Sequence, residues 1–303
     1  MSRTEQRHAP HWQDDPAALW RTAAGFGIFT VLYVVLLSLW FIGAAGLFGL
    51  GDPTRAVQTG TPGADAAGGD ALASGAAATL LFLGSFAAAL VALTLMLRLL
   101  HGRGLAALIG PWPLAGAQFL RVAGHVALLQ AIVWLLPMPA DLRPERHLGL
   151  APWVGLLPVA LPAILIQIAA EELLFRGYLQ SRLSARFANP LVWMVLPSLV
   201  FGALHYQGAA GPNGLWFVAS ATLFALTAAD LTARSGTLGP ALALHFINNV
   251  LAILFIGFGD ELGGLALYHL PVEASDPALT PLMPLDLATT AVLWLAARLA
   301  LRR

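Results

Sequence analysis

The sequence of 303 residues contains no cysteine and no lysine. Without cysteine, the chain can form no disulfide framework, no Cys-ligated metal site and no thiol nucleophile. Charged residues are scarce as well, at 11% of the chain, against about 25% in an ordinary soluble domain. The formal net charge is zero, which argues against nucleic acid as a partner.

Hydrophobic residues make up 58% of the chain, which is more apolar surface than a soluble fold of this length could bury. They gather in repeated runs of about twenty residues, the length that crosses a bilayer. These runs predict an all-α, polytopic membrane protein with about eight transmembrane helices, surrounded by membrane lipid. The expected spans are residues 25–49, 77–100, 116–136, 152–180, 190–207, 214–233, 237–258 and 281–300.

The basic residues, all of them Arg, indicate the orientation of these spans. Setting Arg176 aside because it lies inside a span, twelve Arg fall on the side of the two termini and three on the other side. The positive-inside rule then places both termini in the cytoplasm. The Arg-only, Ala-rich composition is compatible with a GC-rich bacterial genome, so the inner (cell) membrane of a bacterium is the expected location.

Ionisable side chains inside a membrane span cost several kcal/mol and are by default a sign of function. The fourth span contains two adjacent carboxylates, Glu171 and Glu172, followed by Arg176. Residues four apart share a helix face, so Glu172 can pair with Arg176, whereas Glu171 points about 100° away. Glu171 is therefore predicted to be the unpaired, reactive carboxylate. A helix-end salt bridge for both acids is the alternative.

Two later spans carry polar residues at helical spacing. The fifth ends with Phe201 and, four residues on, His205; the seventh contains His245 and, four residues on, Asn249. A single membrane histidine more often bonds a neighbouring helix than takes part in chemistry. At about 1.5 Å of rise per residue, Glu171 and both later motifs could still meet in one cavity in the cytoplasmic half. His205 fits this depth least well.

Three ordered motifs, EExxxR, FxxxH and HxxxN on successive membrane helices, resemble the CAAX protease and bacteriocin-processing family of intramembrane proteases. The eukaryotic relatives of that family are the type II CAAX prenyl endopeptidases. By position, the motifs fall on Glu171, Glu172 and Arg176, on Phe201 and His205, and on His245 and Asn249. Asn248 competes with Asn249 for the last place. The resemblance covers about residues 170–250, and nothing outside that region is specific.

The resemblance implies eight helices around a cavity open to the cytoplasm. We therefore expect a cytoplasmic segment, 1–24, before a single transmembrane domain, 25–303, with its catalytic core at about 152–258. The expected catalytic residues are Glu171, Glu172, His205, His245 and Asn249, with Arg176 and Phe201 as structural or orienting residues.

Two hydrolytic mechanisms fit these side chains. In the first, Glu171 is the general base for a water that His205 orients, while His245 and Asn249 donate hydrogen bonds to the oxyanion. In the second, Glu171, His205 and His245 bind Zn²⁺, and a metal-bound water is the nucleophile. The HExxH spacing of a metal-binding helix is missing, so the sequence favours the metal-free mechanism without deciding between the two.

The expected partner is a peptide or a membrane-associated protein, with or without a lipid-modified Cys. Resemblance to prenyl endopeptidases suggests a C-terminal CAAX-like peptide, although a bacterial relative would normally lack prenylated proteins. Two other functions would also place charged residues in a membrane cavity: a non-catalytic scaffold or immunity protein, and a small-solute transporter. The need for Glu171 in cleavage distinguishes the protease from both.

Overall fold

The computed structural model describes residues 19–48, 71–136, 139–258 and 263–302, and in these ranges the chain is almost entirely helical. The long helices are α1 (Leu19–Phe48), α3 (Ala71–His101), α5 (Trp112–Val133), α6 (Leu150–Glu172), α9 (Gly214–Ser235) and α11 (Met283–Ala300). Shorter ones are α4 (Ala106–Ile109), α7 (Ser181–Arg186), α8 (Leu196–Ala203) and α10 (Gly239–Val250). The expected segment 1–24 and the loop between the first two spans lie largely outside the described residues.

Each of the eight expected spans coincides with a helical stretch, which confirms the all-α membrane class. Within the described residues, six helices are long and apolar enough to cross a membrane, whereas Leu191–Ala203 and Gly239–Phe255 are shorter. The number eight is therefore not confirmed. The first short stretch stops because the backbone tightens into a turn at His205 and Tyr206. The second stops because the chain becomes extended at Ile256.

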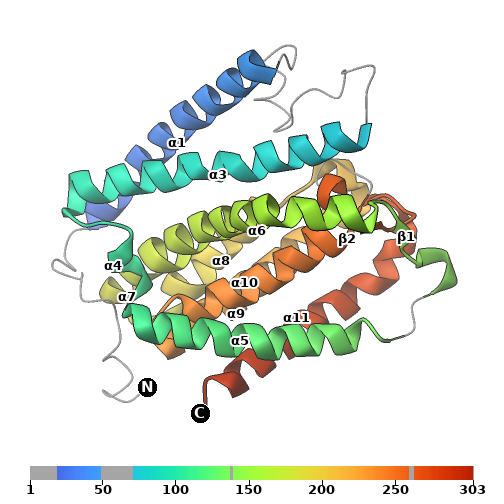
Figure 1. Ribbon diagram of the computed structural model, residues 1–303. Coiled ribbons are helices and arrows are strands. Elements are labelled where there is room, and N and C mark those ends of the chain that lie inside the picture. The colour runs from blue at the N-terminus through green and yellow to red at the C-terminus, as the bar shows by residue number, and fades with distance from the viewer. Residues whose placement is uncertain (1–18, 49–70, 137–138, 259–262, 303) are drawn as a thin grey trace.

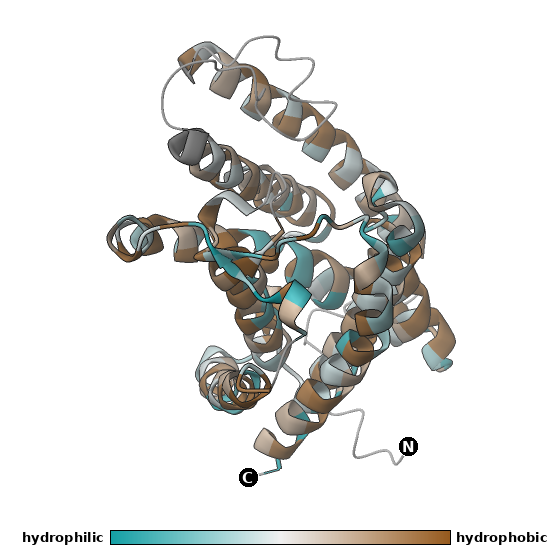
Figure 2. Cartoon of the chain, turned by 90° about the vertical axis from the view of Figure 1, so that its right-hand side faces the viewer, coloured by the Kyte–Doolittle hydropathy of each residue, from teal (hydrophilic) through white to brown (hydrophobic). Residues whose placement is uncertain are grey.

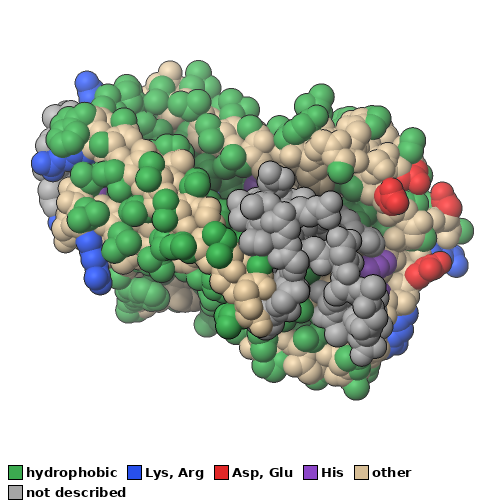
Figure 3. Space-filling view, turned by 90° about the horizontal axis from the view of Figure 1, so that it is seen from above, with side chains coloured by type: hydrophobic (Ala, Val, Ile, Leu, Met, Phe, Trp, Pro, Cys, Tyr) green, Lys and Arg blue, Asp and Glu red, His purple; other side chains and the backbone are tan. Residues whose placement is uncertain are grey.

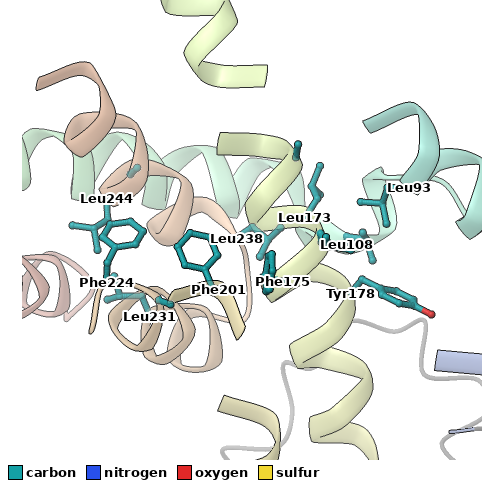
Figure 4. Packing of buried hydrophobic residues seen from close by; sticks show 14 of the residues in the cluster. Leu93, Leu108, Leu173, Phe175, Tyr178, Phe201, Phe224, Leu231, Leu238 and Leu244 are labelled. Atoms are coloured by element: carbon teal, nitrogen blue, oxygen red, sulfur yellow. The ribbon is translucent and has the colours of Figure 1, made fainter. Parts of the chain in front are cut away.

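The helices are layered across the molecule (Figure 1). Helices α1 and α3 form one outer pair, α6, α8 and α10 lie in the middle, and α5 and α11 lie on the opposite side. The main hydrophobic cluster joins the middle layer to its neighbours (Figure 4). Its side chains include Leu93 from α3, Leu173 from the segment directly after α6, Phe201 from α8, Leu231 from α9 and Leu244 from α10.

The outer surface is as apolar as the interior. Large side chains such as Val31, Leu120 and Leu128 are each more than half exposed, at 64%, 72% and 65%, and hydrophobic residues predominate along the helices (Figure 2). Such a surface is stable only in lipid, so the protein is an integral membrane protein. On the face drawn in Figure 3, Asp and Glu side chains gather at one end, and Arg side chains lie at both ends.

Two glycines let helices in the middle of the bundle approach closely. Gly239 on α10 lies against the backbone of Ala115 on α5, and a Cβ atom there would overlap the Ala115 carbonyl. Gly202 on α8 lies against Thr222 and the Val218 carbonyl of α9 in the same way. Small residues at crossings of this kind hold membrane helices together because they bring the backbones into contact.

A small sheet lies at the end where α6 begins. Its strands, in the order β1 (Glu145–Arg146), β3 (Tyr268–His269) and β2 (Ile256–Gly257), are two residues long each. The imidazoles of His147 and His269 stack beside it with their centroids 3.7 Å apart. Nearby, the Trp153 indole of α6 donates to the Leu254 carbonyl at 2.7 Å. These contacts fix the start of α6 against the end of the α10 segment.

Candidate active site

The first motif lies where α6 changes its helical geometry. Helix α6 ends at Glu172 and continues without a break as a π-helix, η3 (Leu173–Gln180), which leads into α7. The α10 helix likewise becomes a π-helix, η6 (Leu251–Phe255), shortly after Asn249. A further π-helix, η4 (Leu191–Val195), precedes α8. Short π segments are rare and occur mostly at functional sites.

Glu172 and Arg176 form a fully buried ion pair one turn apart. The Arg176 Nη1 atom donates to Glu172 Oε1 at 3.0 Å, and the two side chains are 2% and 0% exposed. The same oxygen accepts a hydrogen bond from His245 Nδ1 at 2.8 Å. Glu172 therefore joins the first and third motifs, and it fixes which ring nitrogen of His245 faces away from it.

Glu171 presents its carboxylate to the other side of the same imidazole. Gln167 Nε2 donates to Glu171 Oε1 at 3.0 Å, whereas Glu171 Oε2 lies 3.5 Å from His245 Nε2. That second oxygen is buried and has no hydrogen-bond partner within the described part of the chain. The prediction that Glu172 pairs with Arg176 and leaves Glu171 unpaired with it agrees with this geometry.

Asn249 reaches the site through Gln167. Its Nδ2 atom donates to Gln167 Oε1 at 2.7 Å, and its own carbonyl oxygen accepts from Asn248 at 3.4 Å. Of the two adjacent Asn residues, Asn249 is thus the one connected to the Glu171 carboxylate, through Gln167, and Asn248 contacts Asn249. One N–H of the Asn249 amide remains to be donated to a ligand.

Phe201 packs against the Arg176 guanidinium and against both histidines. Its ring packs under the Arg176 guanidinium, 4.7 Å from ring centroid to Cζ, and contacts the imidazoles of His205 and His245 at centroid distances of 4.5 and 6.3 Å. Phe224 on α9 packs edge-on against His245 at 4.8 Å. Aromatic rings thus pack against both histidines.

His205 lies beyond the end of its helix. The fifth span was expected to continue to residue 207, but α8 ends at Ala203 and His205 follows in a turn. Its Nδ1 atom bonds the Phe201 carbonyl at 2.8 Å, so Nε2 is the nitrogen that can face a ligand. The structure places His205 against Phe201, and its proposed part in catalysis depends on that second nitrogen.

The zinc alternative does not fit the side chains as they lie. Among the described residues, no group of three or more His, Asp or Glu side chains is arranged to hold a metal ion. Glu171 and His245 are neighbours, and His205 would have to supply its Nε2 atom, because its Nδ1 atom is bonded to a backbone carbonyl. No step below is therefore routed through a metal.

Comparison with known proteins covers this same region. A family model described as type II CAAX prenyl endopeptidase Rce1-like matches residues 153–251. Residues 153–251 are similar to Rce1-like endopeptidases. The matched segment begins near the start of α6 and ends at the first residue of η6, so it contains all three motifs and confirms the resemblance drawn from them.

One curated relative also matches part of the chain. The uncharacterized protein YyaK of Bacillus subtilis (strain 168) is 31% identical over 105 residues, which are 34% of this chain and 35% of the relative. The alignment therefore spans about a third of the relative's length. No solved structure matches the chain.

Sequence reasoning missed two contributors to the site. Gln167 belongs to none of the three sequence motifs, yet it bonds both Glu171 and Asn249. The available signal was its polarity inside a span, one turn before Glu171. Phe224 gave no signal, because an aromatic residue in a membrane helix is ordinary.

Proposed function

We propose that this chain is an intramembrane endopeptidase that hydrolyses a peptide bond with water activated by Glu171. The observation that carries the proposal is the Glu171 carboxylate, which has one oxygen held by Gln167 and the other buried 3.5 Å from His245 Nε2. A carboxylate oxygen removed from bulk water and free of other bonds is suited to accept a proton from a bound water. The peptidase description of the matching family supports the same class.

The reaction follows from these positions. A water bound at Glu171 Oε2 attacks the scissile carbonyl carbon and gives one proton to that oxygen. The resulting oxyanion accepts hydrogen bonds from the remaining N–H of Asn249 and from His245 Nε2, which requires a hydrogen on both ring nitrogens. When the C–N bond breaks, the leaving nitrogen takes the proton from Glu171, and the carboxylate is restored. His205 Nε2 orients the water.

Glu172 and Arg176 act behind this set. Because Glu172 Oε1 accepts from His245 Nδ1, the ring is held in one orientation, with Nε2 toward Glu171. Arg176 compensates the charge of Glu172 in a site with almost no solvent. In this proposal, Glu172 positions the imidazole, and Arg176 with Phe201 supports Glu172.

We further propose that the site opens toward the cytoplasm of a bacterial cell and that both termini lie there. The excess of Arg on the side of the two termini, twelve against three in the sequence, supports this orientation. Because the chain has no native Cys, a single Cys placed by Arg302→Cys or Glu145→Cys can be labelled with a membrane-impermeant maleimide. The two positions should react from opposite sides of the membrane, and labelling from the same side would contradict the topology.

The test of function is the loss of cleavage in Glu171→Gln. Proteomes of membranes carrying the native chain and the Glu171→Gln chain at equal expression should differ by truncated peptides or membrane-associated proteins. A fluorogenic peptide ending in a farnesylated CAAX sequence tests the lipid-modified class separately. A scaffold, immunity protein or transporter would show no Glu171-dependent cleavage, and that result would reject the protease.

A further inference from the structure

Gln167 is a buried polar residue that belongs to none of the three motifs. It lies on α6, one turn before Glu171, and is 8% exposed. Its amide uses both ends: Nε2 donates to Glu171 Oε1 at 3.0 Å, and Oε1 accepts from Asn249 Nδ2 at 2.7 Å. A single side chain therefore connects the proposed base on α6 to the proposed oxyanion donor on α10.

We infer that Gln167 is a positioning residue for hydrolysis, which orients the Glu171 carboxylate and the Asn249 amide together. The inference rests on the proposed function. By holding Oε1 of Glu171, Gln167 leaves Oε2, the oxygen beside His245 Nε2, to receive the proton of the attacking water. By accepting one N–H of Asn249, it turns the other N–H outward for the oxyanion.

The chemistry explains why an amide serves this position. A carboxylate there could still accept from Asn249, but it would repel Glu171, and a hydroxyl would be too short to reach two helices. An apolar residue of equal length would leave the Glu171 Oε1 atom and one Asn249 N–H without partners in a buried site, each at a cost in orientation and stability. Only a side chain with a donor and an acceptor satisfies both neighbours.

The experiment compares Gln167→Met with Gln180→Met in the full-length protein. Gln180 is a matched control, since it follows Gln167 in the same helical run, is 5% exposed, and donates from Nε2 to the Ala229 carbonyl at 3.0 Å, a contact outside the site. Both changes remove a buried amide and so cost comparable stability. The substrates are the peptide spanning the cleavage site found in the proteomic comparison and the farnesylated CAAX peptide.

We expect Gln167→Met to lower kcat about 100-fold, as a misplaced reacting group does, with KM changed little. Gln180→Met should keep kcat within a factor of about two or three once rates are corrected for the folded fraction, because its amide lies outside the site. Should Gln167→Met fail to fold, Gln167→Asn, one methylene shorter, carries the same expectation. If Gln167 had a purely structural role, Gln167→Met and Gln180→Met would lower the folded fraction alike, and the corrected kcat of Gln167→Met would stay unchanged.

A double-substitution cycle shows which neighbour Gln167 acts on. In an Asn249→Ala background, Gln167→Met should cost less than in the native chain, because one of its two contacts is already gone. Full additivity, or a corrected kcat for Gln167→Met within a factor of about three of native, would overturn the inference while Glu171→Gln remains inactive. Cleavage that survives Glu171→Gln would instead overturn the proposed function and, with it, this inference.

Discussion

Removing Arg176 should be the most destabilising single change in the polar site, because it leaves Glu172 buried with His245 as its remaining partner. Both members of the ion pair are almost completely buried. Truncating one member of a buried pair costs about 3–5 kcal/mol, whereas replacing both members with uncharged residues is often close to neutral. Arg176→Met should therefore cost about 3–5 kcal/mol, and adding Glu172→Gln should restore most of that loss.

The assay is equilibrium unfolding in mixed micelles by titration with SDS, followed by the fluorescence of the nine Trp residues. Arg234→Met is the matched control, because Arg234 also pairs with an acid one turn away, Asp230, but its side chain is 52% exposed. Exposed pairs contribute about 0–1 kcal/mol. If Arg176→Met costs no more than Arg234→Met, or if Glu172→Gln adds to the loss instead of reversing it, the reasoning about an uncompensated carboxylate is refuted.

Three other predictions follow from the fold and the site. Gly239→Ala should destabilise the protein by about 1–3 kcal/mol, as overpacking does, because the new methyl group meets the Ala115 carbonyl. Gly124→Ala is the control and should cause no such loss of stability, because Gly124 faces open space. Equal unfolding curves for the two variants would contradict the close crossing of α5 and α10. Burial, with a smaller contribution from His269, lowers the pKa of His147 from its ordinary 6.5. Protonation of His147 therefore opposes folding, so stability should fall as the pH drops below that value, and His147→Gln should flatten this dependence; an unchanged pH profile would argue against it. Chelators should leave hydrolysis intact, and stoichiometric zinc measured in active protein by mass spectrometry would contradict the metal-free mechanism.

Which of the two adjacent glutamates pairs with Arg176 could be predicted from helix geometry alone. Spacing of four residues joins Glu172 to Arg176 and leaves Glu171 on a different face, and the structure confirms the pair. The same spacing places His245 and Asn249 on one face of α10. His245 contacts both Glu171 and Glu172, and Asn249 is joined to Glu171 through Gln167. These relations are local, so sequence spacing determines them.

Contacts between helices could not be predicted in the same way. Spacing within α6 says that Gln167 and Glu171 share a face, but the bond from Gln167 to Asn249 depends on how α10 packs beside α6. The position of His205 depends on where α8 ends, and that is decided by the turn at residues 204–206. The predicted span runs through this turn to residue 207, because the apolar run continues to Leu204 and the sequence has no clear stop signal there.

The departures from regular helix are concentrated around the polar residues, and the membrane explains why. In lipid, a backbone group that leaves the α-helical pattern has no water to bond, so irregular backbone is tolerated only where protein or a polar cavity covers it. Here α6 becomes π-helical directly after Glu172, α10 does so soon after Asn249, and α8 ends two residues before His205. Each helix that contributes a motif is thus irregular next to that motif. The two stretches too short to cross the membrane are two of these three helices, so a count of spans by length underestimates the helices that build the site.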